Sequence, residues 1–429
     1  MESVDYERIR RNIIDFKDGY SDNLRRTHTK MIINASRGDI KAKRYLKECI
    51  RQELIRNDFK YKDPDIANPI ITDIYSKYWG LGILEKYDSE DVDELMINGT
   101  RISIEKGGQI IDLPERFESE EEAIRIIRRV LEFDDTLDIS KKNPVKNAER
   151  KDGSRITVAI PPMAKTPYLN IRKFDSFIPT TENLVASGTV SKRMLDVIDL
   201  LIKGKANISI IGEMGSGKTS FTNWAIGRLP LGERVGTLET SFELKTEMYP
   251  NLYFVQLREQ PHLNKGTLGD LFQLLLRQNV KRILLGEMRS GYEVFQYIYA
   301  CTRGHSGSFG TSHNMNAEGM LDDYAAMMLE DGLGTDKETN KRRVAGAIDV
   351  VFKFRKLKSG KRICSSIEEI VKTDDSYEIS PLFVYKFDEN NSSEGEHLEV
   401  NKISRGLINK MNDYGMEMSE IEKVLNYDD

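Results

Sequence analysis

The sequence predicts an α/β protein with two folded domains and a helical N-terminal extension. From about residue 181, short apolar segments alternate with helical segments, which is typical of a doubly wound, mostly parallel sheet. Between about 66 and 160, a helical segment precedes short strands with glycine turns, which indicates an α+β domain. The 429 residues exceed what one ordinary hydrophobic core holds, so we expect two or three domains.

Composition narrows the classes of function. Hydrophobic residues make up 39% and charged residues 31% of the chain, an ordinary balance for a globular protein. The net charge of −5 disfavours a protein that acts on DNA or RNA, because such proteins usually show a basic excess. The three cysteines form no CxxC pair, so neither a disulfide framework nor a zinc knuckle is indicated. No apolar run reaches membrane-spanning length and the N-terminus is charged, so we expect a cytoplasmic protein.

The N-terminal part divides into an extension and a domain. Residues 1–65 are expected to form a helical extension, because residues such as Ile9, Ile13 and Ile14 recur at helical spacing. Residues 66–160 are expected to form the α+β domain, followed by an interdomain linker at 161–180 with two consecutive prolines. The elements expected in this domain are strands at 95–98, 101–105, 109–113 and 156–160 and a helix at 119–131 that Ser119 caps.

The C-terminal part contains the second domain, at 181–375, and an extension at 376–429. Strands of the parallel sheet are expected at 207–211, 234–239, 251–256, 282–285 and 308–312. A hairpin is expected to follow at 350–370, then a polar loop at 390–396 and a small helical tail at 401–429.

One motif carries most of the chemistry. The segment Gly212–Thr219 (GEMGSGKT) fits the phosphate-binding Walker A pattern GxxxxGK[ST], and it stands between an expected strand and an expected helix. The glycines let successive N–H groups curl around phosphate oxygens, and the helix N-terminus adds its dipole. Lys218 is expected to reach the β- and γ-phosphates, and the Thr219 hydroxyl is expected to face Mg²⁺.

Acidic residues and histidines follow the other expected strands. Glu287 comes after the strand at 282–285, which we expect to lie beside the strand of the loop, so that this acid polarises water or holds Mg²⁺. His305 and His313 flank the strand at 308–312, as structural residues or as a γ-phosphate sensor or relay. Glu239 and Glu243 follow the second strand, where they position water or Mg²⁺ or are simply exposed loop acids.

In this order the loop, acidic segment, Gly-Glu strand and histidine segment resemble the ATPases of the secretion superfamily, the ring-forming motors of type II, type IV and Tad pilus systems. The likeness is to the CpaF/TadA branch, and it also covers ELMINGTRISIEKGG at 94–108 and DGSRITVAIPP at 152–162. It implies a RecA-like motor domain, an α+β N-terminal domain, and a homohexamer that hydrolyses ATP with Mg²⁺ and drives an inner-membrane platform protein. The protein would be peripheral to the inner face of the cell membrane through that partner, with no direct nucleic acid.

The resemblance also implies roles for individual residues. Glu287, followed by Arg289, matches the acid of the Gly-Glu strand, and Arg155 and Arg172 match arginines at the interdomain nucleotide cleft, where they neutralise phosphate charge. The implied catalytic residues are Glu287, Glu239, Glu243, His313, His305 and Arg289. The implied nucleotide-binding residues are Gly212, Glu213, Met214, Gly215, Ser216, Gly217, Lys218, Thr219, Ser220, Arg155 and Arg172, and the implied metal-binding residues are Thr219 and Glu287.

Two other functions stay open at this point. Gln256 and Gln260 stand where the branch tends to carry arginines, which favours a nucleotide-binding hexameric scaffold with little turnover. Intact Lys218, Thr219 and Glu287 favour the motor instead. A nucleic-acid translocase is the second alternative, and the acidic net charge disfavours it.

Overall fold

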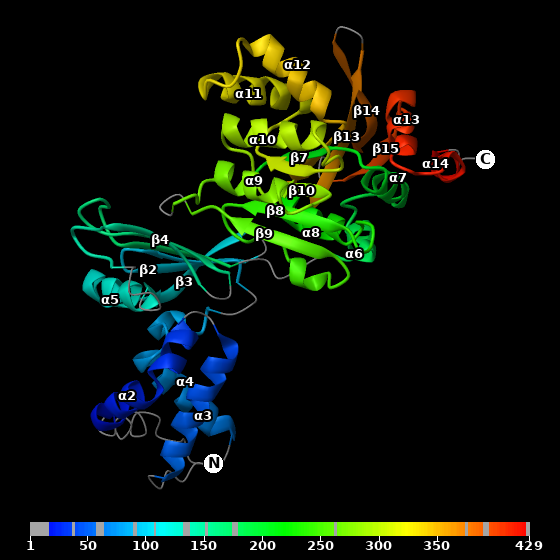
Figure 1. The fold of residues 1–429 in the computed structure, drawn as a ribbon. Helices are drawn as coiled ribbons and strands as arrows, with labels where there is room; N and C mark the ends of the chain where they lie inside the picture. The colour runs from blue at the N-terminus through cyan, green and yellow to red at the C-terminus, as the bar shows by residue number, and fades with distance from the viewer. Residues whose placement is uncertain are drawn as a thin grey trace. The chain divides into compact units, whose positions relative to one another are not determined.

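A computed structural model describes residues 17–36, 39–56, 64–88, 92–106, 109–131, 138–150, 153–173, 179–260, 264–373, 376–388 and 394–425. The chain divides into two compact units, Met1–Asp175 and Ser176–Asp429 (Figure 1). The apolar positions Ile9, Ile13 and Ile14 lie outside the described residues. None of the helices in the described part is both long and apolar enough to cross a membrane.

Three helices begin the first unit: α2 (Lys17–Ser36), α3 (Ile40–Arg56) and α4 (Pro64–Tyr78). Buried residues recur along α3 at every fourth position, namely Ala42, Leu46, Ile50 and Leu54. This spacing places them on one face of the helix, where they pack against α4 in a small apolar core that includes Ile71 and Trp79.

A six-stranded antiparallel sheet completes the first unit, in the order β3-β2-β1-β6-β5-β4. Its strands are β1 (Glu94–Asn98), β2 (Arg101–Lys106), β3 (Gln109–Arg116), β4 (Val145–Glu149), β5 (Arg155–Ala159) and β6 (Tyr168–Arg172). Helix α5 (Glu120–Leu131) buries Ala123, Ile127 and Val130 in the core of this domain. The Ser119 hydroxyl accepts a hydrogen bond from the backbone N–H of Glu122 at 3.2 Å, as expected of a cap.

The segment 161–180, expected to be a linker, contains strand β6, so this prediction is wrong for residues 168–172. Strand β6 lies in the middle of the sheet, between β1 and β5. It alternates buried Leu169 and Ile171 with more exposed neighbours, as a strand with one face on a core does. Prolines on either side favoured a linker, but five alternating residues are enough to make a strand once two partners are present.

The second unit contains a nine-stranded sheet in the order β15-β14-β13-β12-β7-β11-β10-β8-β9. Its strands are β7 (Ile208–Gly212), β8 (Arg234–Glu239), β9 (Tyr253–Arg258), β10 (Arg282–Leu285), β11 (Phe309–Ser312), β12 (Val350–Lys356), β13 (Arg362–Lys372), β14 (Tyr377–Phe387) and β15 (Gly395–Glu399). The six strands from β12 to β9 are parallel, and β13, β14 and β15 add antiparallel pairs. The predicted α/β class with a mostly parallel sheet is therefore confirmed.

Helices cover both faces of this sheet, and an apolar core lies on each face. One core joins the sheet to α7 (Lys192–Lys203), α8 (Lys218–Ile226), α13 (Arg405–Asp413) and α14 (Met418–Leu425). The other joins it to α9 (Leu268–Leu276), α10 (Gly291–Thr302), α11 (Ala317–Glu330) and α12 (Lys337–Ala347). All residues of β7, β10 and β11 are buried, as expected for parallel strands covered on both sides.

Two details of this sheet differ from the sequence-based expectations. Strand β10 does not lie beside β7, because β11 lies between them. The segment expected as a C-terminal extension supplies β14 and β15 to the same sheet, and β15 includes Gly395 and Glu396, which we expected in a polar loop. The rest of that expected loop lies outside the described residues, apart from Glu394.

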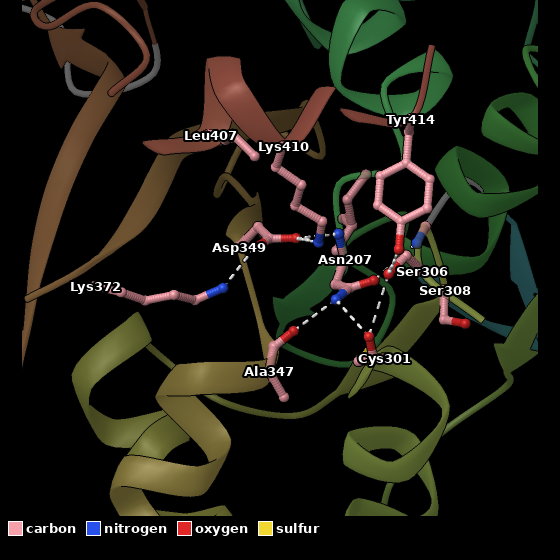
Figure 2. Close-up of polar contacts among 12 residues, drawn as sticks. Asn207, Cys301, Ser306, Ser308, Ala347, Asp349, Lys372, Leu407, Lys410 and Tyr414 are labelled. Atoms are coloured by element: carbon pink, nitrogen blue, oxygen red, sulfur yellow. Dashed lines mark hydrogen bonds and ion pairs between the residues drawn. The ribbon is translucent and has the colours of Figure 1, made fainter. Parts of the chain in front are cut away.

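Helix α13 is tied to the sheet by a polar cluster around Asp349 (Figure 2). Asp349, which is 4% exposed, accepts hydrogen bonds from the backbone N–H of Asn207 at 2.7 Å and from Lys372 at 2.8 Å. Lys410 of α13 forms an ion pair with the same carboxylate. Tyr414 donates to the hydroxyl of Ser306 at 2.7 Å. Helix α13 is thus held at the edge where β7 and β12 begin.

Candidate functional site

The segment Gly212–Ser220 forms a loop between the end of β7 and the first turn of α8. A Cβ at Gly212 would lie 2.2 Å from the carbonyl oxygen of Phe354 on β12, so only glycine fits there. Gly217 caps α8 with a φ of 98°, a left-handed conformation that also favours glycine. The loop therefore ends at a helix N-terminus, where unpaired N–H groups and the helix dipole favour an anion.

Lys218 of this loop has a 7% exposed side chain that points back over the end of β7. Its ammonium group donates to the carbonyl oxygens of Gly212 at 2.6 Å and Glu213 at 3.1 Å, and it lies 3.2 Å from Nδ1 of His313. Burial lowers the pKa of Lys218 to about 8, although the carboxylates of Glu287 and Glu243 oppose this change. A phosphate group in the loop would add negative charge directly at this ammonium group, whose hydrogen-bond partners are two carbonyl oxygens and an imidazole nitrogen.

His313 connects Lys218 to Glu287. Its Nε2 lies 2.9 Å from Oε1 of Glu287, while its Nδ1 faces the Lys218 ammonium group. An ammonium group can only donate, so Nδ1 must be the acceptor and Nε2 must carry the proton that is donated to Glu287. The three side chains thus form a continuous polar chain from the loop to the acid.

The order of strands explains why this chain exists. Strand β11 lies between β7 and β10, so His313, directly after β11, is placed between the groups that follow β7 and β10. Because the strands are parallel, their carboxyl ends all lie at this edge of the sheet. Glu287 is therefore not a direct neighbour of the loop strand, and it reaches Lys218 through the histidine.

Arg289 holds the carboxylate of Glu287 from the other side. The two side chains form an ion pair, and Arg289 also donates its backbone N–H to Glu293. Burial by itself would raise the pKa of Glu287, but Arg289, His313 and Lys218 outweigh it and leave that pKa below its usual value. Glu287 is therefore ionised at neutral pH, as a proton acceptor must be.

The two acids after β8 have different surroundings. Glu243 accepts a hydrogen bond from the Thr219 hydroxyl at 3.2 Å, so it lies at the loop. Glu239 is 2% exposed and accepts from the backbone N–H groups of Glu243 at 2.7 Å and Leu244 at 3.0 Å. Burial raises the pKa of Glu239 to about 7, which suits an acid that holds a chain segment in place.

The loop and the acids beside it offer oxygen atoms that could hold Mg²⁺. The described residues contain no cluster of three or more His, Cys, Asp or Glu side chains able to hold a metal ion. Nucleotide-bound Mg²⁺ does not need one, because it usually takes one or two protein oxygens together with phosphates and water. The Thr219 hydroxyl and the Glu243 carboxylate, already in contact, supply oxygens of the required kind.

Of the other predicted residues, His305 lies away from this site within the second unit, and Arg155 and Arg172 belong to the first unit. His305 precedes β11, so it lies at the opposite edge of the parallel sheet, where Nδ1 is 3.0 Å from the carbonyl oxygen of Val280. Arg155 and Arg172 belong to the first unit, where they face each other on β5 and β6. Arg172 also forms an ion pair with Glu94 at 3.4 Å, so one face of that sheet carries two adjacent cations near one acid.

One residue at the loop is not predicted from the sequence. Arg362 begins β13, and its Nε donates to the carbonyl oxygen of Gly215 at 3.0 Å. It lies 147 residues after Gly215 and belongs to an antiparallel hairpin, so local sequence patterns do not connect it with the loop. The only available signal was the density of basic residues in that hairpin.

A glycine-rich loop with a buried lysine, placed between a parallel strand and a helix N-terminus, defines the phosphate-loop class of nucleotide-binding proteins. Within that class, the chain belongs to the family of type II/IV secretion system proteins, which matches residues 80–384. The predicted resemblance to the secretion superfamily is confirmed at this level.

Individual relatives agree with this family. The type IV secretion system protein VirB11 of Bartonella quintana is 26% identical over 256 residues, which cover 51% of this chain and 72% of the relative. The protein VirB11 of Agrobacterium fabrum is 25% identical over 304 residues, or 64% of this chain and 87% of the relative. Among solved structures, the VirB11 ATPase of Brucella suis is 24% identical in sequence. The match covers 66% of this chain and 94% of the chain in that structure, with a TM-score of 0.37.

Proposed function

We propose that this chain is a Mg²⁺-dependent ATPase that powers type IV pilus or Tad-type assembly, protein secretion or conjugative transfer. The observation that carries the proposal is the chain of contacts Lys218–His313–Glu287, which joins a complete phosphate-binding loop to an ionised acid. Membership of the type II/IV secretion system family supports the proposal that this ATPase works in a secretion machine.

The loop would bind the triphosphate. Backbone N–H groups from Gly212 to Ser220 surround the β-phosphate, and Lys218 exchanges its carbonyl partners for the β- and γ-phosphate oxygens. Thr219 and the ionised Glu287 are the proposed metal-binding residues, and Glu243 adds an oxygen beside Thr219. Bound Mg²⁺ would neutralise negative charge on the β- and γ-phosphates.

Glu287 would act as the general base. It accepts a proton from the water whose oxygen attacks the γ-phosphorus, and the bond from this phosphorus to the leaving oxygen of ADP breaks. His313 would sense the γ-phosphate, because a phosphate that draws Lys218 away removes the donor to Nδ1 while Nε2 still holds Glu287. Arg289 would keep Glu287 ionised, and Glu239 would hold the segment that presents Glu243.

Arg155 and Arg172 are the proposed cations from the first unit. Their opposed positions on β5 and β6 form a paired positive site that suits phosphate oxygens. We propose that nucleotide binds between the two units of a homohexamer, that hydrolysis moves the units relative to each other, and that the motion acts on an inner-membrane platform protein. The protein would then be cytoplasmic and peripheral to the membrane through that partner, in the manner of the CpaF/TadA branch.

A hexameric scaffold that binds ATP without turning it over is the second candidate. Gln256 favours it, because its amide donates to the carbonyl oxygen of Leu244 at 3.3 Å, in a position where a motor of this branch tends to carry an arginine. A nucleic-acid translocase is the third candidate, and the net charge of −5 disfavours it.

Mg²⁺-dependent ATP hydrolysis by the purified chain, with the oligomeric state measured on the same samples, tests the proposal. Glu287→Gln is expected to lower turnover by about 10²-fold or more while ATP still binds, because the site loses its proton acceptor. Lys218→Ala is expected to lose both binding and turnover. His313→Ala is expected to lose turnover. His305→Ala is its matched control, because His305 lies at the other end of β11, and this variant is expected to keep turnover. ATP binding without hydrolysis in the wild-type hexamer, also in the presence of membranes that contain the platform partner, would favour the scaffold.

A further inference from the structure

The β12–β13 hairpin brings a group of cations to the phosphate-binding loop. Six basic residues and no acidic residue occur from Lys353 to Arg362. None of these six forms an ion pair with a carboxylate among the residues that the structure describes. Arg355 and Lys361 lie over the aromatic rings of Phe387 and Tyr385 on β14, at 5.7 and 5.8 Å from the ring centroids. Arg362 instead turns to the loop.

Arg362 is held closely at the loop although its side chain is exposed. Its Nε donates to the carbonyl oxygen of Gly215 at 3.0 Å, and its Cδ lies 3.2 Å from where a Cβ at Gly217 would stand. Its backbone is fixed as well, because its carbonyl oxygen accepts from the Thr189 hydroxyl at 2.9 Å. Two residues further along the strand, Cys364 donates its backbone N–H to the carbonyl oxygen of Thr189 at 2.8 Å.

The strand order fixes which part of a nucleotide Arg362 faces. His313 and Glu287 lie on the β11 and β10 side of the loop, so the γ-phosphate belongs on that side. The hairpin lies on the other side of β7, because β12 is the opposite neighbour of that strand. A triphosphate that spans the loop with its γ-phosphate toward β11 therefore directs its ribose and base toward the hairpin and Arg362.

We propose that Arg362 binds the nucleoside half of the nucleotide, with its guanidinium group against the base and ribose. This inference rests on the proposed function and adds the residue that recognises the nucleoside. Nε is occupied by Gly215, which fixes the guanidinium plane, while the four remaining N–H donors and the flat face are available. A guanidinium plane can stack on an aromatic ring and form hydrogen bonds at its edge, which an ammonium group cannot do.

Two ligands separate nucleoside recognition from support of the loop. Binding of Mg²⁺-ADP and of Mg²⁺ with inorganic triphosphate is measured by calorimetry for the wild type, Arg362→Gln and Arg362→Lys. Both variants are expected to bind ADP on the order of 10-fold more weakly and to bind inorganic triphosphate as the wild type does, because only ADP has a nucleoside. Lys358→Gln is the matched control, since it removes an exposed cation from the turn of the same hairpin, and it is expected to change neither affinity.

The outcomes distinguish this inference from the function on which it rests. Equal losses for ADP and triphosphate would mean that Arg362 only supports the loop, and unchanged affinity for both would mean that it has no part in binding; either result overturns the inference. Lys218→Ala is expected to lose binding of both ligands. If Lys218→Ala loses binding and Arg362→Gln binds both ligands as the wild type does, the proposed function stands and the inference about Arg362 is overturned. A wild-type chain that binds neither ligand would overturn both proposals.

Discussion

Nucleotide binding should be coupled to proton uptake by Lys218. Burial lowers the pKa of this lysine to about 8, so at pH 8 about half of the free protein carries it uncharged. Bound phosphate groups favour the ammonium form and raise the pKa again. Binding of Mg²⁺-ADP at pH 8 should therefore take up about half a proton, and almost none at pH 6.5. As the pH rises above 8, the affinity should fall by up to about 10-fold per pH unit.

Calorimetry in two buffers of different ionisation enthalpy measures this uptake, because the heat changes in proportion to the protons exchanged. Lys218→Arg is the control, since a guanidinium group stays charged throughout this pH range, and its binding, measured at higher ligand concentration, should take up no proton. A wild type whose heat at pH 8 does not depend on the buffer would refute the reasoning. So would the same uptake in Lys218→Arg, since another group would then be the one that titrates.

Two further predictions concern stability. The pKa of Glu239 is raised from 4.5 to about 7, so its contribution to folding is complete below about pH 4.5 and is lost as the pH rises through 7, by about 3 kcal/mol in total. Glu239→Gln keeps a hydrogen-bond acceptor and should remove this pH dependence of the free energy of unfolding, measured by urea unfolding at pH 5 and pH 8. A variant whose free energy of unfolding falls between these pH values as much as that of the wild type would contradict the prediction. Asp349→Ala leaves Lys410 and Lys372 without their shared buried carboxylate, so it should lower the free energy of unfolding by about 3 kcal/mol. Asp322→Ala, which breaks exposed ion pairs, is the control and should change stability little; equal effects of the two would show that burial of Asp349 is unimportant.

Some of the site could be predicted because the chemistry is local in the sequence. The loop Gly212–Thr219 needs only its own glycines, lysine and threonine and the strand and helix beside it, so a single segment is enough to predict it. The position of Glu287 at the end of a strand follows for the same reason. The alternation of strands and helices likewise predicted the α/β class, because parallel strands need crossover connections.

Other parts were missed because they depend on partners far along the chain. Strand β6 is five residues long between proline-containing segments, and it becomes a strand through pairing with β1 and β5. His305 and His313 look alike in the sequence as residues that flank one strand. The direction of β11 in a parallel sheet places the second at the loop and the first at the other edge.

The sequence by itself determined the phosphate-binding loop, the acid that follows β10 and the α/β class, because each rests on contacts within one short segment or on the periodicity of burial. Only the tertiary structure decided that β11 separates β10 from β7, that His313 joins Lys218 to Glu287, and that Arg362 reaches the loop from the β12–β13 hairpin. Strand order and hairpin placement are set by how two apolar cores close around the whole sheet, and no local segment contains that information.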